Sequence, residues 1–208
     1  MLIKFEGTCL AINKMASNKI TTTLESGENL NIIGPSGSGK SSYVNALIGL
    51  PSMLKGNVII DGINLKIFHS SKWSIMRRKI IACVFQNLEL FQDLSVADNI
   101  KIVTGLYKSI DESKKDFIID SLDLNPFKNT KVKNLSLGEI QRLAICRALV
   151  RPFSLLILDE PFSHLDKDNI QKSIQLINQI SNDNQAGLIL TSHSESQDFA
   201  FDKTIVLQ

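Results

Sequence analysis

One glycine-rich run in this chain has residue types that could hold an anion: GPSGSGKS, over residues 34–41. The run fits the pattern G-x-x-x-x-G-K-[ST] and lies between an apolar stretch and a helix-like stretch. Its glycines let the backbone curl so that successive N–H groups point inward at phosphate oxygens, and the helix that follows adds the positive end of its dipole. This context favours a phosphate cradle over a glycine-rich turn that binds nothing.

The lysine and serine at the end of this run indicate what would be held. Lys40 is placed to reach the β- and γ-phosphates of a nucleotide, and Ser41 is placed to bind Mg²⁺. We therefore predict a site for a nucleoside triphosphate and its metal ion. The predicted contacts are Gly34, Pro35, Ser36, Gly37, Ser38, Gly39, Lys40, Ser41 and Ser42.

Two neighbouring carboxylates follow an apolar stretch at residues 155–158. A buried strand there would deliver Asp159 and Glu160 to the carboxyl edge of a parallel sheet, where open α/β folds bind ligands. Asp159 suits the positioning of Mg²⁺ through a water molecule, and Glu160 suits the polarisation of an attacking water. Taken alone, such a pair is typical of the start of a loop. Together with Lys40 and Ser41 it predicts hydrolysis of the triphosphate.

The elements that must position these residues follow a regular pattern. Short apolar runs typical of strands buried on both faces of a parallel sheet occur at residues 30–33, 80–85, 155–158 and 188–190. Helical patterns separate most of them. We therefore expect an α/β fold with a mainly parallel core sheet flanked by helices.

Two further lobes are expected around this core. Residues 1–28 are typical of short strands and turns, and the Asp-Gly pair at 61–62 is a hairpin signal, so an antiparallel β lobe should flank the sheet. Residues 95–134 are polar and helix-like, which indicates an inserted helical lobe. We expect a single domain over residues 1–208, with the core and β lobe at about 1–86 and 135–208 and the helical lobe at about 87–134.

Composition excludes several classes of protein. Hydrophobic residues make up 43% and charged residues 21% of the chain, which is ordinary for a folded protein and unlike a disordered one. A net charge of +2 with scattered basic residues argues against nucleic-acid binding. No apolar run approaches the roughly 18 residues that span a bilayer, and the first residues do not resemble a secretory leader. Cys9, Cys83 and Cys146 lack metal-ligand spacing, so we expect buried reduced thiols and a cytoplasmic location.

The segment that narrows the class further is LSLGEIQR at residues 135–142. It resembles the signature motif of the ABC ATPase family, and the other motifs occur in that family's order: Gln86 after a strand, SHLD at 163–166, and His193 after the last apolar strand. The resemblance covers nearly the whole chain and implies the P-loop NTPase fold, with ATP and Mg²⁺ as ligands. The same segment also contains a capping box, at Ser136 and Glu139, that would open an amphipathic helix.

The resemblance implies roles for these residues. Glu160, His193 and Gln86 would be the catalytic set, and Ser41, Gln86 and Asp159, the last through water, would hold Mg²⁺. A capped helix N-terminus presents N–H groups to an anion, and in the family that anion is the γ-phosphate of ATP held by the opposite subunit. Two subunits would therefore close head to tail as a homodimer or a heterodimer. The residues expected to bind ATP across that interface are Ser136, Gly138, Glu139 and Asp166.

Three features depart from the family's pattern. Leu137 stands where the family has the first of two glycines, and its bulk predicts slower or weaker closure of the dimer. After Phe5 the chain has no aromatic residue upstream of the phosphate run that could stack on adenine. An apolar platform is expected instead from Leu10, Ile12 or Met15. His164 stands where most relatives have a small residue.

The resemblance further implies the ATP-hydrolysing subunit of an ABC transporter, held at the inner face of the membrane by a separate integral membrane permease. An ABC-type ATPase that drives a non-transport membrane signalling complex is the alternative. The motifs are most similar to the subgroup that serves lipoprotein release, macrolide export and cell division. Leu88, Leu90 and Phe91 form an apolar cluster where family members receive a coupling helix of the permease, unless they simply pack the helical lobe on the core.

Overall fold

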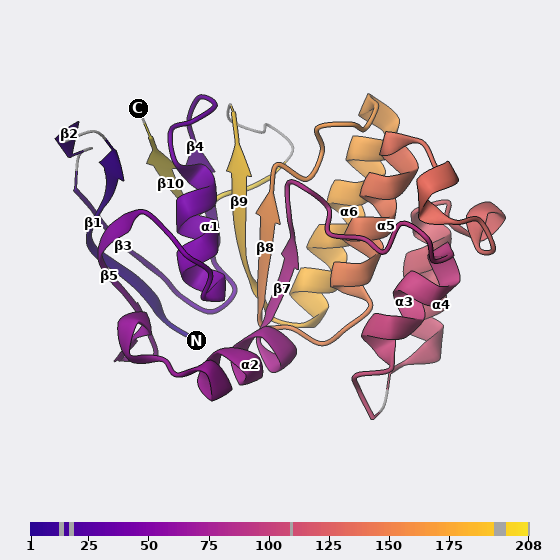
Figure 1. The fold of residues 1–208 in the computed structure, drawn as a ribbon, viewed down its shortest axis with the longest axis horizontal. Helices are drawn as coiled ribbons and strands as arrows, with labels where there is room; N and C mark the ends of the chain where they lie inside the picture. The colour runs from indigo at the N-terminus through magenta and orange to yellow at the C-terminus, as the bar shows by residue number, and fades with distance from the viewer. Residues whose placement is uncertain (13–14, 17–18, 109, 194–198, 208) are drawn as a thin grey trace.

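The computed structural model describes residues 1–12, 15–16, 19–108, 110–193 and 199–207, with the backbone alone for residues 11, 12, 15 and 16. Within them, a parallel sheet in the order β10-β4-β9-β8-β7 forms the centre of the molecule (Figure 1). Its strands are β4 (Asn29–Ile33), β7 (Ile81–Val84), β8 (Leu155–Asp159), β9 (Gly187–Ser192) and β10 (Lys203–Val206). The parallel core predicted from the apolar runs is confirmed.

The register of this sheet decides which residues lie together at the carboxyl ends of its strands. Ile33 pairs with Ser192, and Asp159 pairs with Thr191. Because all neighbouring strands run parallel, the segments after β4, β7, β8 and β9 leave the sheet at one edge. Every residue of the predicted catalytic set follows one of these strand ends.

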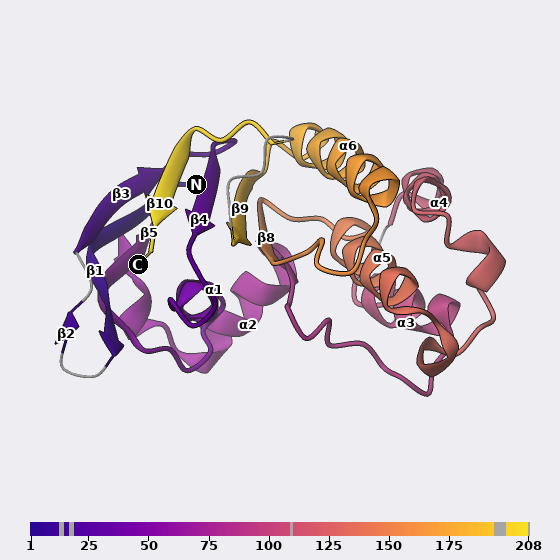
Figure 2. The ribbon, with the colours of Figure 1, turned by 90° about the horizontal axis from the view of Figure 1, so that it is seen from above.

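A second, antiparallel sheet flanks the first (Figures 1 and 2). Its strands are β1 (Ile3–Ile12), β2 (Met15–Ala16), β3 (Ile20–Leu24), β5 (Leu54–Ile60) and β6 (Ile63–Asn64). The hairpin predicted from the Asp-Gly pair is confirmed, since Ile60 pairs with Ile63. Strand β1 is ten residues long, not short as expected. It pairs with β3 and with β5, and the register of both pairings shifts near residues 5–9.

Helices cover both faces of the parallel sheet. They are α1 (Lys40–Ile48), α2 (Ser70–Lys79), α3 (Val96–Thr104), α4 (Glu112–Ser121), α5 (Leu137–Leu149) and α6 (Lys167–Asp183), with short 3₁₀ turns at Leu65–Ile67, Asn125–Phe127 and Val132–Asn134. Helices α5 and α6 lie against one face, and α3 and α4 lie beyond them (Figures 1 and 2). In the described part of the chain, no helix is both long enough and apolar enough to cross a bilayer.

Two hydrophobic clusters share the parallel sheet as a common wall. On strand β8, Leu155 and Ile157 face the cluster formed with α1 and the antiparallel sheet. Leu156 and Leu158 face the cluster formed with α3, α4, α5 and α6. Strand β8 is fully buried, as the unbroken apolar run of a parallel strand predicts. The strand that carries Asp159 is thus packed against a hydrophobic cluster on each face of the sheet.

Candidate active site

The phosphate loop, defined as residues 34–39, joins β4 to α1, and Lys40 folds back over it. Lys40 Nζ donates hydrogen bonds to the carbonyl oxygens of Gly34, at 2.8 Å, and Pro35, at 3.1 Å. Among the described residues no side chain caps the N-terminus of α1, so its first N–H groups keep their capacity to bind an anion. Ser38 Oγ is buried and has no hydrogen-bond partner among the described residues. These unpartnered donors fit a phosphate chain.

Leu10 packs beneath this loop. A Cβ atom added at Gly39 would lie 2.2 Å from Leu10 Cδ1, and φ at Gly39 is 94°, so only glycine fits there. Only 3% of the Leu10 surface is exposed. The expectation that Leu10 offers adenine an open apolar platform is therefore wrong, because the side chain supports the loop instead. The other two candidates, Ile12 and Met15, lie outside the residues whose side chains the structure describes.

Glu160 is the centre of the candidate site. One carboxylate oxygen, Oε1, lies 3.1 Å from Lys40 Nζ. The other, Oε2, lies 3.2 Å from His193 Nε2 and accepts a hydrogen bond from Gln86 Nε2 at 3.3 Å. Lys40 and Glu160 are only 5% and 13% exposed, whereas His193 is 57% exposed. The structure thus brings together the three predicted catalytic residues and the predicted phosphate-binding lysine.

Asp159 lies deeper than Glu160. Burial raises the pKa of its carboxyl group, and hydrogen bonds from Thr191 and Ser41 partly offset this effect. Asp159, Ser41 and Gln86 line one open pocket, although they come from three separate segments. Among the described residues no three His, Cys, Asp or Glu side chains cluster as an all-protein metal site. This donor set fits Mg²⁺, which usually takes one or two protein ligands and completes its shell with water and substrate phosphates.

The signature segment opens α5 with the predicted capping box. Glu139 N donates to Ser136 Oγ at 3.4 Å, and Ser136 N donates to Glu139 Oε2 at 2.8 Å. Leu137 is 59% exposed at the first position of the helix. A Cβ at Gly138 would lie 3.2 Å from the carbonyl oxygen of His164, so the turn at 163–165 packs closely on this end of α5.

The residues predicted for the dimer interface are not joined to the Lys40 and Glu160 cluster. Within the described part of the chain, no hydrogen bond or ion pair links Ser136, Glu139 or Asp166 to either residue. Asp166 caps α6 instead, accepting from Asn169 N at 2.8 Å, and this hydrogen bond lowers the pKa of Asp166. Among the described residues, the cluster around Lys40 and Glu160 is therefore separate from the residues predicted for the dimer interface.

Comparison with known proteins identifies the class of this site. The sequence model of the family described as ABC transporter matches residues 17–163, which is well over half of the chain. The chain belongs to this family. It is an ATP-binding cassette, and the family's chemistry is ATP hydrolysis.

Relatives of the cassette come from several transport systems. It is 37% identical over 179 residues to the lipoprotein-releasing system ATP-binding protein LolD of Buchnera aphidicola subsp. Schizaphis graminum, covering 85% of this chain and 78% of that protein. It is 32% identical to the thiamine import ATP-binding protein ThiQ of Salmonella choleraesuis, covering 85% and 74%. Its fold matches a dimeric post-hydrolysis structure of the cassette MJ0796 bound to ADP and Pi, with a TM-score of 0.79, 26% identity, and coverage of 93% and 88%.

Two polar residues of the cassette's site escaped the sequence analysis. Thr191 Oγ1 donates to Asp159 Oδ1 and accepts from Glu160 N at 3.2 Å. Gln141, on α5, donates to the carbonyl oxygen of Glu160 at 3.3 Å. Both side chains are buried, and buried polar groups need partners. Burial is not visible in the sequence, so no local signal marked either residue.

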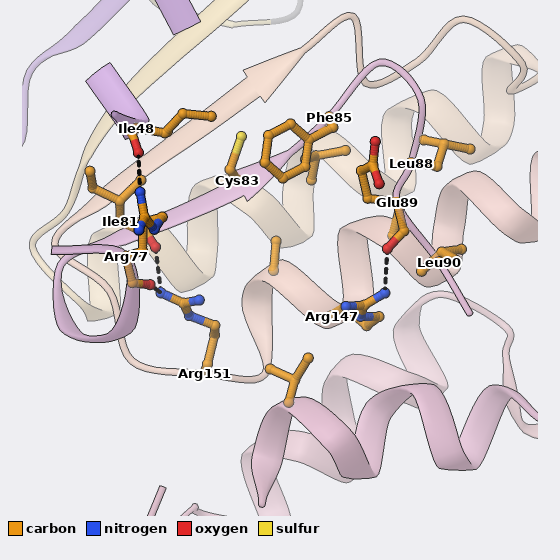
Figure 3. Close-up of a pocket in the computed structure, with 14 residues that line it drawn as sticks. Ile48, Arg77, Ile81, Cys83, Phe85, Leu88, Glu89, Leu90, Arg147 and Arg151 are labelled. Atoms are coloured by element: carbon orange, nitrogen blue, oxygen red, sulfur yellow. Dashed lines mark hydrogen bonds between the residues drawn. The ribbon is translucent and has the colours of Figure 1, made fainter. Parts of the chain in front are cut away.

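The cassette also has a groove between β7 and helices α3 and α5 (Figure 3). Apolar side chains line its floor, among them Phe85, Leu88 and Leu90. Three arginines line it as well: Arg77, Arg147 and Arg151. They donate to backbone carbonyl oxygens of Ile48, at 3.0 Å, Glu89, at 2.9 Å, and Arg77, at 2.7 Å, respectively. No ion pair joins any of these guanidinium groups to a carboxylate within the described residues.

Proposed function

We propose that this cassette binds ATP with Mg²⁺ and hydrolyses it to drive a membrane permease carried on a separate polypeptide. The observation that carries the proposal is the contact of Glu160 with Lys40, Gln86 and His193 at the edge of the parallel sheet. A carboxylate that can activate water lies there beside the cation that would hold the γ-phosphate. Such a chain would lie on the cytoplasmic face of the membrane, attached through its permease.

In this proposal the phosphate loop binds the triphosphate. Lys40 exchanges its bond with Glu160 for the β- and γ-phosphates, while the N–H groups at the start of α1 face the phosphate oxygens. Ser38 Oγ gains the acceptor that it lacks among the described residues. Release from Lys40 leaves the Glu160 carboxylate available to a water molecule.

Ser41 and Gln86 would hold Mg²⁺ directly, and Asp159 would hold it through a water molecule. When bound, Mg²⁺ neutralises charge on the β- and γ-phosphates. The raised pKa of Asp159 follows from its burial, and a nearby cation would favour its charged form. Thr191 fixes the direction of the carboxylate through its hydrogen bond to Oδ1.

Hydrolysis itself would place a water molecule between Glu160 and the γ-phosphorus. Glu160 orients this water and accepts its proton as the oxygen attacks, and the bond between the γ-phosphorus and the bridging oxygen breaks to leave ADP and phosphate. His193 Nε2, which lies 3.2 Å from Glu160, would stabilise the γ-phosphate oxygens. The exposure of His193 allows it to reach a ligand outside the cluster.

A second subunit would complete the site. Helix α5 presents a capped N-terminus at Ser136, and its next residue, Leu137, is exposed. This end of the helix is separate from the chain's own Lys40, so it suits the γ-phosphate of ATP on a facing subunit. A second copy of this chain or a related cassette could supply it, and the dimeric structures among its relatives support such an arrangement.

The permease would bind in the groove of Figure 3. The apolar floor formed by Phe85, Leu88 and Leu90 suits the apolar face of a short helix, and the three arginines suit acidic groups on it. Phe85 lines the groove, and the next residue, Gln86, is bonded to Glu160. A displacement of Phe85 by the bound helix would therefore also move Gln86 in the catalytic cluster.

Two measurements test this function. Equilibrium binding of Mg-ATP to the purified chain should be lost in Lys40→Ala and kept in Lys55→Ala, which removes an exposed lysine on β5. A tagged chain purified from native membranes should carry a permease with it, and flux through the reconstituted pair would separate a transporter from a signalling complex. Lack of nucleotide binding by the wild-type chain would refute the proposal.

A further inference from the structure

The side chain of Gln141 connects three parts of the molecule. It is 1% exposed and lies one turn into α5, the helix that begins after Ser136. Its Nε2 donates to the carbonyl oxygen of Glu160 at 3.3 Å. Its Oε1 accepts from the backbone N of His164 at 3.2 Å, from Ser163 Oγ at 3.3 Å, and contacts His164 Nδ1 at 3.0 Å. One buried amide therefore bonds to the predicted catalytic base and to the turn that follows it.

The direction of this amide is fixed by backbone groups. The carbonyl of Glu160 can only accept and the N–H of His164 can only donate, so Nε2 must face Glu160 and Oε1 must face His164. His164 Nδ1 lies 3.0 Å from this Oε1 and 2.9 Å from Ser163 Oγ. In the tautomer with the proton on Nδ1, His164 donates to Oε1.

Glu160 needs such support because its backbone is unusual. Its φ is 51°, in the left-handed region that a residue with a Cβ atom rarely adopts. On the amide side, Glu160 N donates to Thr191 O at 3.3 Å and to Thr191 Oγ1 at 3.2 Å. On the carbonyl side, the donor is Gln141. These bonds hold the conformation that directs the carboxylate at Lys40.

We propose that Gln141 and His164 are positioning residues for Glu160. Gln141 holds the Glu160 carbonyl, and His164 locks the Gln141 amide from the other side. The turn that carries His164 also packs on Gly138 in the first turn of α5, so the same contacts tie Glu160 to the helix end that would meet a second subunit. This inference rests on the proposed function, in which Glu160 activates water.

Substitutions at His164 separate positioning from simple packing. In His164→Asn, a side-chain amide N–H can replace Nδ1–H, whereas His164→Ala removes the side-chain donor and leaves Oε1 only the backbone N–H of residue 164 and Ser163 Oγ. We expect His164→Ala to lower kcat by about 10- to 100-fold, with the Kd for Mg-ATP within about twofold of wild type, because a misplaced base slows chemistry but not binding. His164→Asn should recover most of the lost turnover. Equal turnover in His164→Ala and wild type would overturn the inference.

Gln141→Glu tests the other end of the amide. It keeps an oxygen that accepts from His164 but loses the N–H group that donates to the carbonyl oxygen of Glu160. It should lower kcat by a similar factor without changing the Kd for Mg-ATP. In a Glu160→Gln background, His164→Ala should cause little further loss in single-turnover experiments, since it acts through Glu160. Fully additive losses would overturn the inference. Wild-type turnover, measured alongside, reports the proposed function separately: active wild type with unaffected variants refutes only the positioning roles, and inactive wild type refutes both.

Discussion

The ammonium group of Lys40 lies 3.1 Å from the carboxylate of Glu160, in a part of the site where both side chains are largely buried. In the proposed function these two groups serve different partners, a phosphate and a water molecule. Their direct bond means that binding of the γ-phosphate must compete with Glu160 for the same cation. Arrival of ATP would thus release the base that hydrolyses it.

Glu160→Gln tests this competition. The substitution removes the carboxylate that accepts a proton from water, so turnover should fall by about 10²- to 10⁴-fold. It also removes the anion paired with Lys40, so the Kd for Mg-ATP should stay the same or decrease. Steady-state ATPase assays and equilibrium binding on the same preparation measure both. Loss of ATP binding in this variant would contradict the role given to Glu160.

Asp159→Asn should separate stability from activity. Because burial raises the pKa of Asp159, the native state holds its proton more tightly than the unfolded state does. The free energy of unfolding therefore falls as pH rises from about 4, the ordinary Asp value, through the raised pKa. The Asn variant should be more stable than wild type at pH 7, and the difference should vanish toward pH 3. Denaturant titrations across this range, beside loss of ATPase activity, provide the check.

Leu137→Gly removes the side chain whose bulk is predicted to slow closure of the dimer. Leu137 is exposed at the start of α5, so the variant should lose at most about 1 kcal/mol of stability from the helix. If the side chain obstructs a facing subunit, the variant should dimerise more tightly with ATP and turn over several times faster. Sedimentation of a Glu160→Gln pair with and without Leu137→Gly would show it. Unchanged affinity, dimerisation and turnover would count against the obstruction.

Arg147→Glu tests the groove of Figure 3 as the permease site. Burial lowers the pKa of Arg147, yet the guanidinium group keeps its charge at neutral pH, and it donates to a carbonyl oxygen rather than to a carboxylate. Reversal of this charge should reduce recovery of the permease in co-purification by about tenfold or more. Arg78→Glu, an exposed arginine on α2 outside the groove, is the matched control. Equal recovery in both variants would place the permease elsewhere.

Much of the fold follows from local pattern. The run at 155–158 is apolar without alternation, as burial on both faces requires, and it forms β8 with Asp159 at its end. The capping box at Ser136 appears as predicted because a cap depends on residues three positions apart. The division into a core and a helical lobe at 87–134 stays a prediction, as do the roles assigned to the site residues.

Other features could not be predicted because they depend on contacts between distant segments. The sequence predicts Leu10 as part of a nucleotide platform, but its side chain lies against Gly39, and no local pattern encodes that approach. Gln141 occupies the buried face of α5, where the sequence favours an apolar residue, and its partner Glu160 lies on another element. Such polar residues at core positions are the ones to examine first in a related sequence.

The side chains of β8 alternate between two cores, and this fixes how the strand can change. Loss or gain of a single residue within Leu155–Asp159 would turn every following side chain through half a rotation, exchanging the cores that Leu156 and Ile157 fill. It would also advance or withdraw the carboxylate pair by about 3.3 Å relative to the phosphate loop. Substitutions can accumulate in this strand, but its length cannot change. The same five positions decide which core each side chain enters and how far the carboxylates extend toward the phosphate loop.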